Sequence, residues 1–289
     1  MSRKAAKRRP RAPKVKSTKP PRASAAVVDD QPNQKLRAPR HGYVERYCAF
    51  IDILGFQRLI TGLKGTDEQF LALREALKRV HAPVGQPTVN WHTDFRAQSI
   101  SDTVAISTLA TDGGLIPLFQ VIEALAIDLL KEGYFIRGAL TKGKLDHDDT
   151  MVFGEALVRA YELENTVARY PRVIITRDVM ADIDRFCKGF FLAHRREEFT
   201  PYIEQAADGP HFVHVLRTIS ANVQRGQFDG YQRMQDMIQK RLDEATDDPR
   251  HFEKVQWFAL YWRKFVPYSV TGFKTITGPG MDRVEWTTQ

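Results

Sequence analysis

Two aspartates at the ends of apolar segments are the residues of this chain best placed to do chemistry. Asp52 closes the run YCAFIDI, and Asp102 stands in SISD, between two segments with strand-like patterns. If those strands are neighbours, they lie about 4.8 Å apart, so both carboxylates can face one point beyond the sheet edge. Such a pair can hold two divalent cations, and hard oxygen ligands favour Mg²⁺ or Mn²⁺.

A glycine, Gly55, follows Asp52 in the sequence DILGF and predicts a sharp turn from the strand into a helix. Backbone N–H groups at a helix start favour an anion such as a triphosphate, and a glycine lets the backbone come close to it. The plainer interpretation is that Asp52 only caps the helix. The second carboxylate at Asp102 favours the metal site.

The elements that must position these residues alternate between strand and helix patterns. The sequence predicts a buried strand at YCAFIDI, helices from LGFQRLITGL and EQFLALREALKRVHAP, and two strands that turn near Ser101 and Asp102. An apolar helix ended by Gly133, a strand, an amphipathic helix and the short strand RVIITRDV follow. This order predicts an α+β fold, an α/β sandwich in which helices lie against a mixed sheet.

The pattern is weaker after residue 180. The segments FLAHRREEFTPYIE and HFVHVLRTI predict strands. GYQRMQDMIQKRLDEA and HFEKVQWFALYWRKFV predict two helices, with Trp257 and Trp262 of the second as core residues.

The net charge of +8 comes from the N-terminal tail. Residues 1–40 carry 13 Lys or Arg and 2 Asp, so the remainder has 30 basic and 33 acidic residues and a net charge of −3. The tail is rich in Pro, Lys, Arg and Ala with few large apolar residues, which predicts disorder. It can be a solubilising extension, or it can attract nucleic acid or an anionic membrane. The tail lacks the interleaved aromatic residues that would stack on nucleic-acid bases.

Composition excludes several classes of protein. No run approaches the roughly 20 apolar residues of a membrane span, and no apolar segment follows the basic N-terminus as in a secretory signal. Cys48 and Cys187 lie in apolar contexts, which predicts reduced thiols of a cytoplasmic protein. His81, His92 and His147 show no metal-ligand spacing and are expected in loops or at the surface.

The motif FIDILGF resembles the Phe-x-Asp-Ile-x-Gly-Phe signature of the class III nucleotidyl cyclases. In that family the Asp binds both metals, the following Ile binds one through its carbonyl, and a second Asp lies at the next hairpin. The resemblance therefore implies Asp52, Ile53 and Asp102 as metal ligands. YFIRGALTKGKL and VFGEALVRAYELE resemble the family's later strand, loop and helix. The resemblance makes residues 43–180 the catalytic core and residues 181–289 a C-terminal part of the same fold, and it implies a homodimer with sites across the interface.

Four departures from the family's motifs point to the substrate of this chain. The ribose-orienting Asn falls at Val158, the transition-state Arg at Glu162, and the two purine-reading positions at Met151 and Gln98. The combination resembles the pyrimidine cyclases of the Pycsar antiphage system, which convert UTP or CTP to the 3′,5′-cyclic monophosphate. That product is a second messenger for a separate effector. The resemblance therefore implies a phosphorus–oxygen lyase. It favours UTP as the substrate, because UTP is the substrate of most of the related pyrimidine cyclases.

Three side chains are expected near the base or sugar. Phe50 shares its side of the strand with Asp52 and can lie against the nucleotide, although a core position is equally compatible. Arg96 and Gln98 are expected on one face with Asp102, where both can hydrogen-bond a pyrimidine. Arg96 can equally be a surface charge. The missing arginine can be replaced by Arg137, Arg159 or Arg169.

Other functions remain open. A cyclase domain that has lost turnover would bind a triphosphate without forming product. A palm-type polymerase or diguanylate cyclase also places carboxylates at a strand end and a hairpin, but SISD replaces the Gly-Gly-Asp/Glu-Glu-Phe signature. Nucleic-acid binding would depend on the positive charge of the tail, and the near-neutral charge of the rest of the chain argues against this function.

Overall fold

The computed structural model describes residues 42–56, 60–61, 68–81, 93–188 and 193–281. The chain divides into two units, residues 1–38 and 39–289, and only the second is considered below. The tail expected to be disordered, most of the helix expected after Gly55, and His92 lie outside the described residues.

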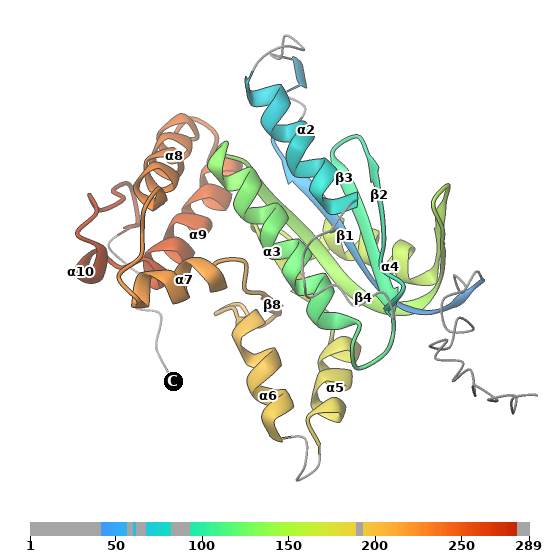
Figure 1. Cartoon of the computed structure of the whole chain (residues 1–289). Coiled ribbons are helices and arrows are strands. Elements are labelled where there is room, and N and C mark those ends of the chain that lie inside the picture. Colours follow the sequence, from blue (N-terminus) through green and yellow to red (C-terminus); the bar gives the residue numbers. More distant parts are fainter. Residues whose placement is uncertain (1–41, 57–59, 62–67, 82–92, 189–192, 282–289) are drawn as a thin grey trace, which may run out of the picture. The chain divides into compact units, whose positions relative to one another are not determined.

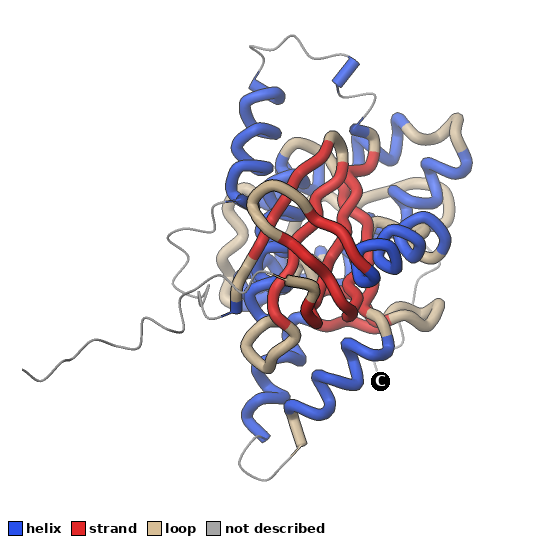
Figure 2. The backbone as a smooth tube through the Cα atoms, turned by 90° about the vertical axis from the view of Figure 1, so that its right-hand side faces the viewer, coloured by secondary structure: helices blue, strands red, loops and turns tan. Residues whose placement is uncertain are grey.

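The described strands form one mixed sheet (Figure 2). Their order is β2-β3-β1-β4-β6-β8-β7, with β5 paired to β4. All pairings are antiparallel except β4 with β6. The strands are β1 (Val44–Leu54), β2 (Arg96–Ile100), β3 (Thr103–Leu109), β4 (Phe135–His147), β5 (Val152–Gly154), β6 (Val173–Ile175), β7 (Ile203–Gln205) and β8 (His211–Val213).

The described helices are packed on both faces of this sheet (Figure 1). They are α2 (Glu68–His81), α3 (Leu115–Lys131), α4 (Glu155–Thr166), α5 (Arg177–Phe186), α6 (Ala193–Phe199), α7 (Arg217–Gln224), α8 (Tyr231–Glu244), α9 (Pro249–Phe265) and α10 (Tyr268–Thr271). The predicted fold class, a mixed sheet covered by helices with a helical C-terminal part, is confirmed. None of the described helices has the length and apolar character needed to cross a membrane.

Strand β1 separates two environments because its side chains alternate between the faces of the sheet. Tyr47, Ala49, Ile51 and Ile53 are buried in the main core, which also contains residues of α2 and α3. The opposite face meets α4, where Cys48 is buried with side chains of α4 and β4. Asp52 belongs to this second face with Cys48 and Phe50, whereas Leu54 at the end of the strand packs against the main core.

The C-terminal part contains one wrong prediction and one that is only partly right. In HFVHVLRTI only His211–Val213 form a strand, and Arg217 begins helix α7. Residues 193–199 form helix α6, not a strand, and only Ile203–Gln205 pair with β8. The buried residues Phe199 and Tyr202 are spaced by three, which suits a helix followed by a 3₁₀ turn. The helices predicted from GYQRMQDMIQKRLDEA and HFEKVQWFALYWRKFV are confirmed as α8 and α9.

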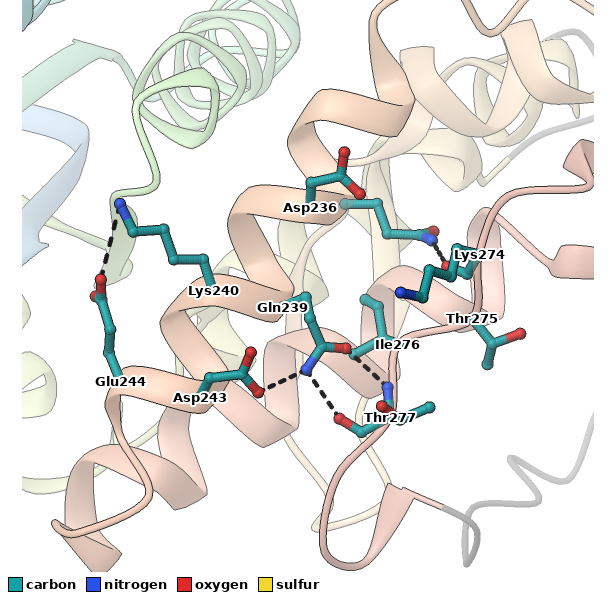
Figure 3. A pocket seen from close by; sticks show the side chains of 10 residues that line it. Asp236, Gln239, Lys240, Asp243, Glu244, Lys274, Thr275, Ile276 and Thr277 are labelled. Atoms are coloured by element: carbon teal, nitrogen blue, oxygen red, sulfur yellow. Dashed lines mark hydrogen bonds and ion pairs between the residues drawn. The ribbon is translucent and has the colours of Figure 1, made fainter.

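Helix α8 holds the C-terminal segment through two glutamine side chains. Gln239 and Thr277 exchange amide hydrogen bonds of 3.0 and 2.8 Å, beside a cleft of about 470 Å³ (Figure 3). Gln235 donates to the Lys274 carbonyl and accepts from Trp262 Nε1 at 3.0 Å. Trp262 is fully buried, as predicted for a core residue. This cleft is lined by α8 and residues 274–277, and neither Asp52 nor Asp102 lines it.

Candidate functional site

Asp52 and Asp102 lie at the same edge of the sheet. Asp52 stands opposite Thr103 of β3, and the Ile53 N–H donates to the Asp102 carbonyl at 2.9 Å. Asp102 occupies the two-residue turn between β2 and β3, in which Ser101 has a φ of 57°. The expectation that the two strands are neighbours is confirmed, whereas the metal-binding roles of the carboxylates remain predictions.

Gly55 is required by the backbone conformation at this edge. Its φ is +81°, in the left-handed region where side chains are strained. A Cβ atom at this position would meet no heavy atom within 4 Å. The glycine is therefore explained by the turn after β1, and its expected approach to phosphates remains a prediction.

Arg137 of β4 connects Asp52 to a third carboxylate. It stands opposite Asp52 in the sheet, and its Nε donates to Asp52 Oδ2 at 2.8 Å. Its Nη2 lies 2.7 Å from Glu164 Oε1 of α4. Burial raises the pKa of Glu164, and the positive charge of Arg137 opposes that shift.

Sequence reasoning missed Glu164, although a signal for it exists. The buried stripe of α4 consists of Ala156, Ala160 and Glu164, each four residues apart. A carboxylate that continues an alanine stripe at helical spacing faces the protein, where it needs a partner.

The C-terminal helix α9 brings a second cation toward this cluster. Lys254 is half-buried, and burial lowers its pKa, with Arg137 acting in the same direction. The carboxylates of Asp52 and Glu164 oppose that shift. Residues of α9 thus belong to the electrostatic environment of Asp52.

The expected base-reading residues share one face of the sheet. Phe50 and Gln98 both stand opposite Ala105 of β3, on either side of it, and Arg96 lies two residues before Gln98. Phe50 also contacts Tyr161 of α4 edge to face, with ring centroids 5.6 Å apart. Asp102 lies beyond the end of β2, so strand alternation does not determine its direction.

Arg96 and Gln98 already make contacts within the chain. Arg96 donates to Asp94 at 2.9 Å and to Asp149 at 2.7 Å. Gln98 donates to the Thr150 carbonyl at 3.1 Å, and its Oε1 has no hydrogen-bond donor among the described residues. Asp149 is mostly exposed, whereas Asp94 is largely covered, so the two ion pairs of Arg96 differ in their access to solvent.

The structure separates the three arginines expected to replace the family's transition-state residue. Arg159 pairs with Asp178 at 2.6 Å, and Arg169 pairs with Glu253 at 2.7 Å. Of the three, Arg137 is the one that contacts Asp52.

The expectation for His147 is wrong. It lies at the end of β4, is 5% exposed, and its Nδ1 lies 2.8 Å from Ser107 Oγ. Ser107 also accepts a hydrogen bond from the buried Arg46, which pairs with Asp94 at 2.7 Å. His147 was expected in a loop or at the surface, but β4 continues through residue 147 by pairing with β5. By contrast, His81 is exposed at the end of α2, as expected.

We expect His147 to make the fold sensitive to acid. Burial lowers the pKa of His147 from 6.5 to about 4, and the positive charges of Arg46 and Arg96 act in the same direction. The negative charges of Asp94 and Asp148 oppose this shift. The unfolded chain therefore takes up a proton first, and stability falls as the pH decreases from about 6.5 to about 4. The full loss is roughly 3 kcal/mol.

Urea unfolding at several pH values between 7 and 4 measures this dependence. His147→Gln should flatten it, whereas His81→Gln, at the exposed end of α2, should leave it unchanged. An unaltered slope in a folded His147→Gln protein would contradict the assignment. His214, whose pKa is lowered to about 3 by burial, should account for part of the remaining slope.

The donor set at the sheet edge fits a divalent ion that takes its remaining ligands from water or phosphate. In the described part of the chain, no group of three or more His, Cys, Asp or Glu side chains converges as a metal site does. Mg²⁺ in nucleotide enzymes is held by one or two carboxylates, and phosphates and water supply the other ligands. Two carboxylates from adjoining strands meet that requirement.

Comparison with known proteins gives weak similarities. No family model and no curated protein matches the chain. Among solved structures, it is similar to the guanylyl cyclase domain of the RhoGC fusion protein from the aquatic fungus Blastocladiella emersonii, with 13% identity and a TM-score of 0.39. The alignment covers 60% of this chain and 95% of that domain.

Two bacterial structures are similar at the same level. One is a class III adenylyl cyclase-like ATP-binding protein from Pseudomonas aeruginosa, with 12% identity, a TM-score of 0.34, and coverage of 53% of this chain and 40% of that one. The other is an adenylate/guanylate cyclase/hydrolase from Silicibacter pomeroyi, with 14% identity, a TM-score of 0.31, and coverage of 60% and 96%. These values leave the functional argument to the residues of the site.

Proposed function

We propose that this protein is a pyrimidine nucleotidyl cyclase that converts UTP or CTP to the 3′,5′-cyclic monophosphate and pyrophosphate. The observation that supports this proposal is that Asp52 and Asp102 lie together at one sheet edge. The motif resemblance adds that Gln98 and Met151 fall where class III cyclases read purines. In this proposal the product is a second messenger of antiphage defence that activates a separate effector.

Asp52 and Asp102, with the Ile53 carbonyl, would hold two Mg²⁺ or Mn²⁺ ions. Bound there, the ions would lower the pKa of the ribose 3′-hydroxyl and neutralise charge on the phosphates. In the reaction the 3′-oxygen forms a bond to the α-phosphorus and loses its proton, and the bond to the pyrophosphate oxygen breaks.

Arg137 is the proposed replacement for the family's transition-state arginine. Its guanidinium lies beside Asp52 and its side chain is 22% exposed, so it can reach a phosphate bound at this edge. Two of its nitrogens contact carboxylates, and Nη1 has no partner within the described residues. A cation placed in advance of the reaction stabilises the charge that develops on the α-phosphate.

Phe50, Arg96 and Gln98 are the proposed contacts to the sugar and base. Gln98 Oε1 lacks a donor among the described residues, and both uracil N3–H and the cytosine amino group can supply one. Arg96 can exchange its exposed partner Asp149 for a base oxygen while Asp94 retains it. These contacts accept either pyrimidine, and the resemblance to uridylate cyclases favours UTP.

A homodimer is part of the proposal. Large apolar side chains are exposed on α4, on and beside β5, and at the end of β2, and a second copy of the chain can cover them: Tyr43, Ile100, Met151, Phe153, Val158 and Tyr161. Val158 and Tyr161 are one helical turn apart on α4, and Tyr43 stacks on Phe153. Exposed apolar surface of this kind is typical of an interface.

Product analysis tests the proposal. The full chain is incubated with Mn²⁺ and each of the four ribonucleoside triphosphates separately, and products are identified by mass spectrometry. Cyclic UMP or cyclic CMP is expected, with little or no cyclic AMP or cyclic GMP. Triphosphate binding without any product would instead favour a cyclase domain that has lost turnover, the function that Val158 and Glu162 at the family's Asn and Arg positions would suggest.

A further inference from the structure

Arg137 is shared between two carboxylates in different surroundings. The hydrogen bond from its Nε to Asp52 Oδ2 is 2.8 Å long. The contact of its Nη2 with Glu164 Oε1 is 2.7 Å but is not aligned as a hydrogen bond, so that oxygen has no aligned donor among the described residues. The Glu164 side chain is 4% exposed, against 14% for Asp52. Glu164 therefore has unused capacity to accept from Arg137.

A divalent ion at Asp52 would compete with Arg137 for the same carboxylate oxygens. The guanidinium keeps its charge at every accessible pH, so it cannot leave by losing a proton. Moving it away from Asp52 without another partner would leave a partly buried charge unpaired, which is costly. Glu164 supplies that partner within the present contact distance.

We propose that Glu164 is a positioning residue that takes Arg137 from Asp52 when a divalent ion binds. Ion binding and the placement of Arg137 are then coupled: as Asp52 is freed, Glu164 keeps the guanidinium paired through Nη2, and Nε and Nη1 become available to a substrate phosphate. The inference rests on the proposed function, because it assigns the ion at Asp52 to the cyclase site. It adds a carboxylate from α4 that no cyclase motif in the sequence marked.

Binding of Mn²⁺ to the full chain without nucleotide tests this coupling independently of activity. Electron paramagnetic resonance of free Mn²⁺ gives the dissociation constant. Glu164→Gln should raise it about tenfold, because Arg137 then stays on Asp52, and Arg137→Gln should lower it, because the competitor is removed. Glu155→Gln, at an exposed position of the same helix, is the matched control and should leave it unchanged.

A double variant separates positioning from a direct effect of charge. If Glu164 acts through Arg137, Glu164→Gln has little effect in the Arg137→Gln background. The same tenfold weakening in that background would overturn the inference, because Glu164 would then attract the ion by its own charge. The double variant also removes both partners together, so neither charge is left buried alone, and thermal unfolding checks that each variant is folded.

Asp52→Asn distinguishes failure of the inference from failure of the proposed function. Loss of Mn²⁺ binding in Asp52→Asn, with wild-type binding in a folded Glu164→Gln protein, would overturn the role of Glu164 alone. Mn²⁺ binding that is unchanged in Asp52→Asn would overturn both. If the wild type binds no Mn²⁺ without nucleotide, the role of Glu164 in ion binding is overturned, and the product analysis still decides the proposed function.

Discussion

Replacing Asp52 by asparagine is expected to reduce cyclic nucleotide formation on the order of 10³-fold, because several kcal/mol of charge stabilisation by the metal are lost. The substitution keeps the size and shape of the side chain and removes its charge. Arg137 retains Glu164 as an ion partner at 2.7 Å, so the fold should persist. Initial rates with Mn²⁺ and the preferred pyrimidine triphosphate measure the effect.

The controls for this prediction come from the same chain. Asp102→Asn should lose activity to a similar extent, and the double variant should be little worse than either one, because both carboxylates serve the same ions. Asp236→Asn, at an exposed position of α8, should retain wild-type activity. Unchanged product formation in a folded Asp52→Asn protein would remove the metal-binding role from this aspartate.

The carboxylate edge could be predicted from sequence because its determinants are local. An apolar run identifies β1, a polar pair between two alternating segments identifies the β2–β3 turn, and the glycine after Asp52 marks the end of the strand. Antiparallel pairing of neighbouring strands then brings Asp52 and Asp102 together. No long-range information beyond that pairing was needed.

The rest of the cluster depends on contacts between distant segments. Glu164 and Lys254 belong to helices whose patterns predict their existence but not the side of the sheet on which they lie. From the sequence, Arg137 was one of three equally suitable candidates for the missing arginine. Its pairing with Asp52 across the sheet distinguishes it from the other two. Arg96 illustrates the same limit, because its partner Asp149 follows β4 and approaches only when β2 and β4 belong to one sheet.

Helix α6 was mispredicted for a related reason. The segment FLAHRREEFTPYIE has apolar residues at both ends and charges between them, a pattern that fits a strand as well as a helix. Burial of Phe199 and Tyr202 against the main core decides in favour of the helix. Its ion pair between Arg195 and Glu198 adds only a small amount.

Val158→Asp is expected to separate the proposed dimer and to abolish most of the activity. Val158 is 56% exposed on α4, so a single chain should tolerate the substitution. At a covered interface, however, the new carboxylate would be desolvated without a partner, which costs several kcal/mol and should weaken association by at least about 10²-fold. Sedimentation velocity and specific activity, both measured over a range of protein concentrations, test this prediction.

The matched control is Val270→Asp, the same substitution at a position of α10 that is 52% exposed and outside the proposed interface. It should leave both the association state and the rate unchanged. If Val158→Asp remained dimeric and active, the apolar surface around α4 would not be the interface. If it were monomeric and fully active, one chain would hold a complete site. Loss of dimer and activity together, with Mn²⁺ affinity retained, would mean that the metal carboxylates belong to one chain and that turnover requires the partner.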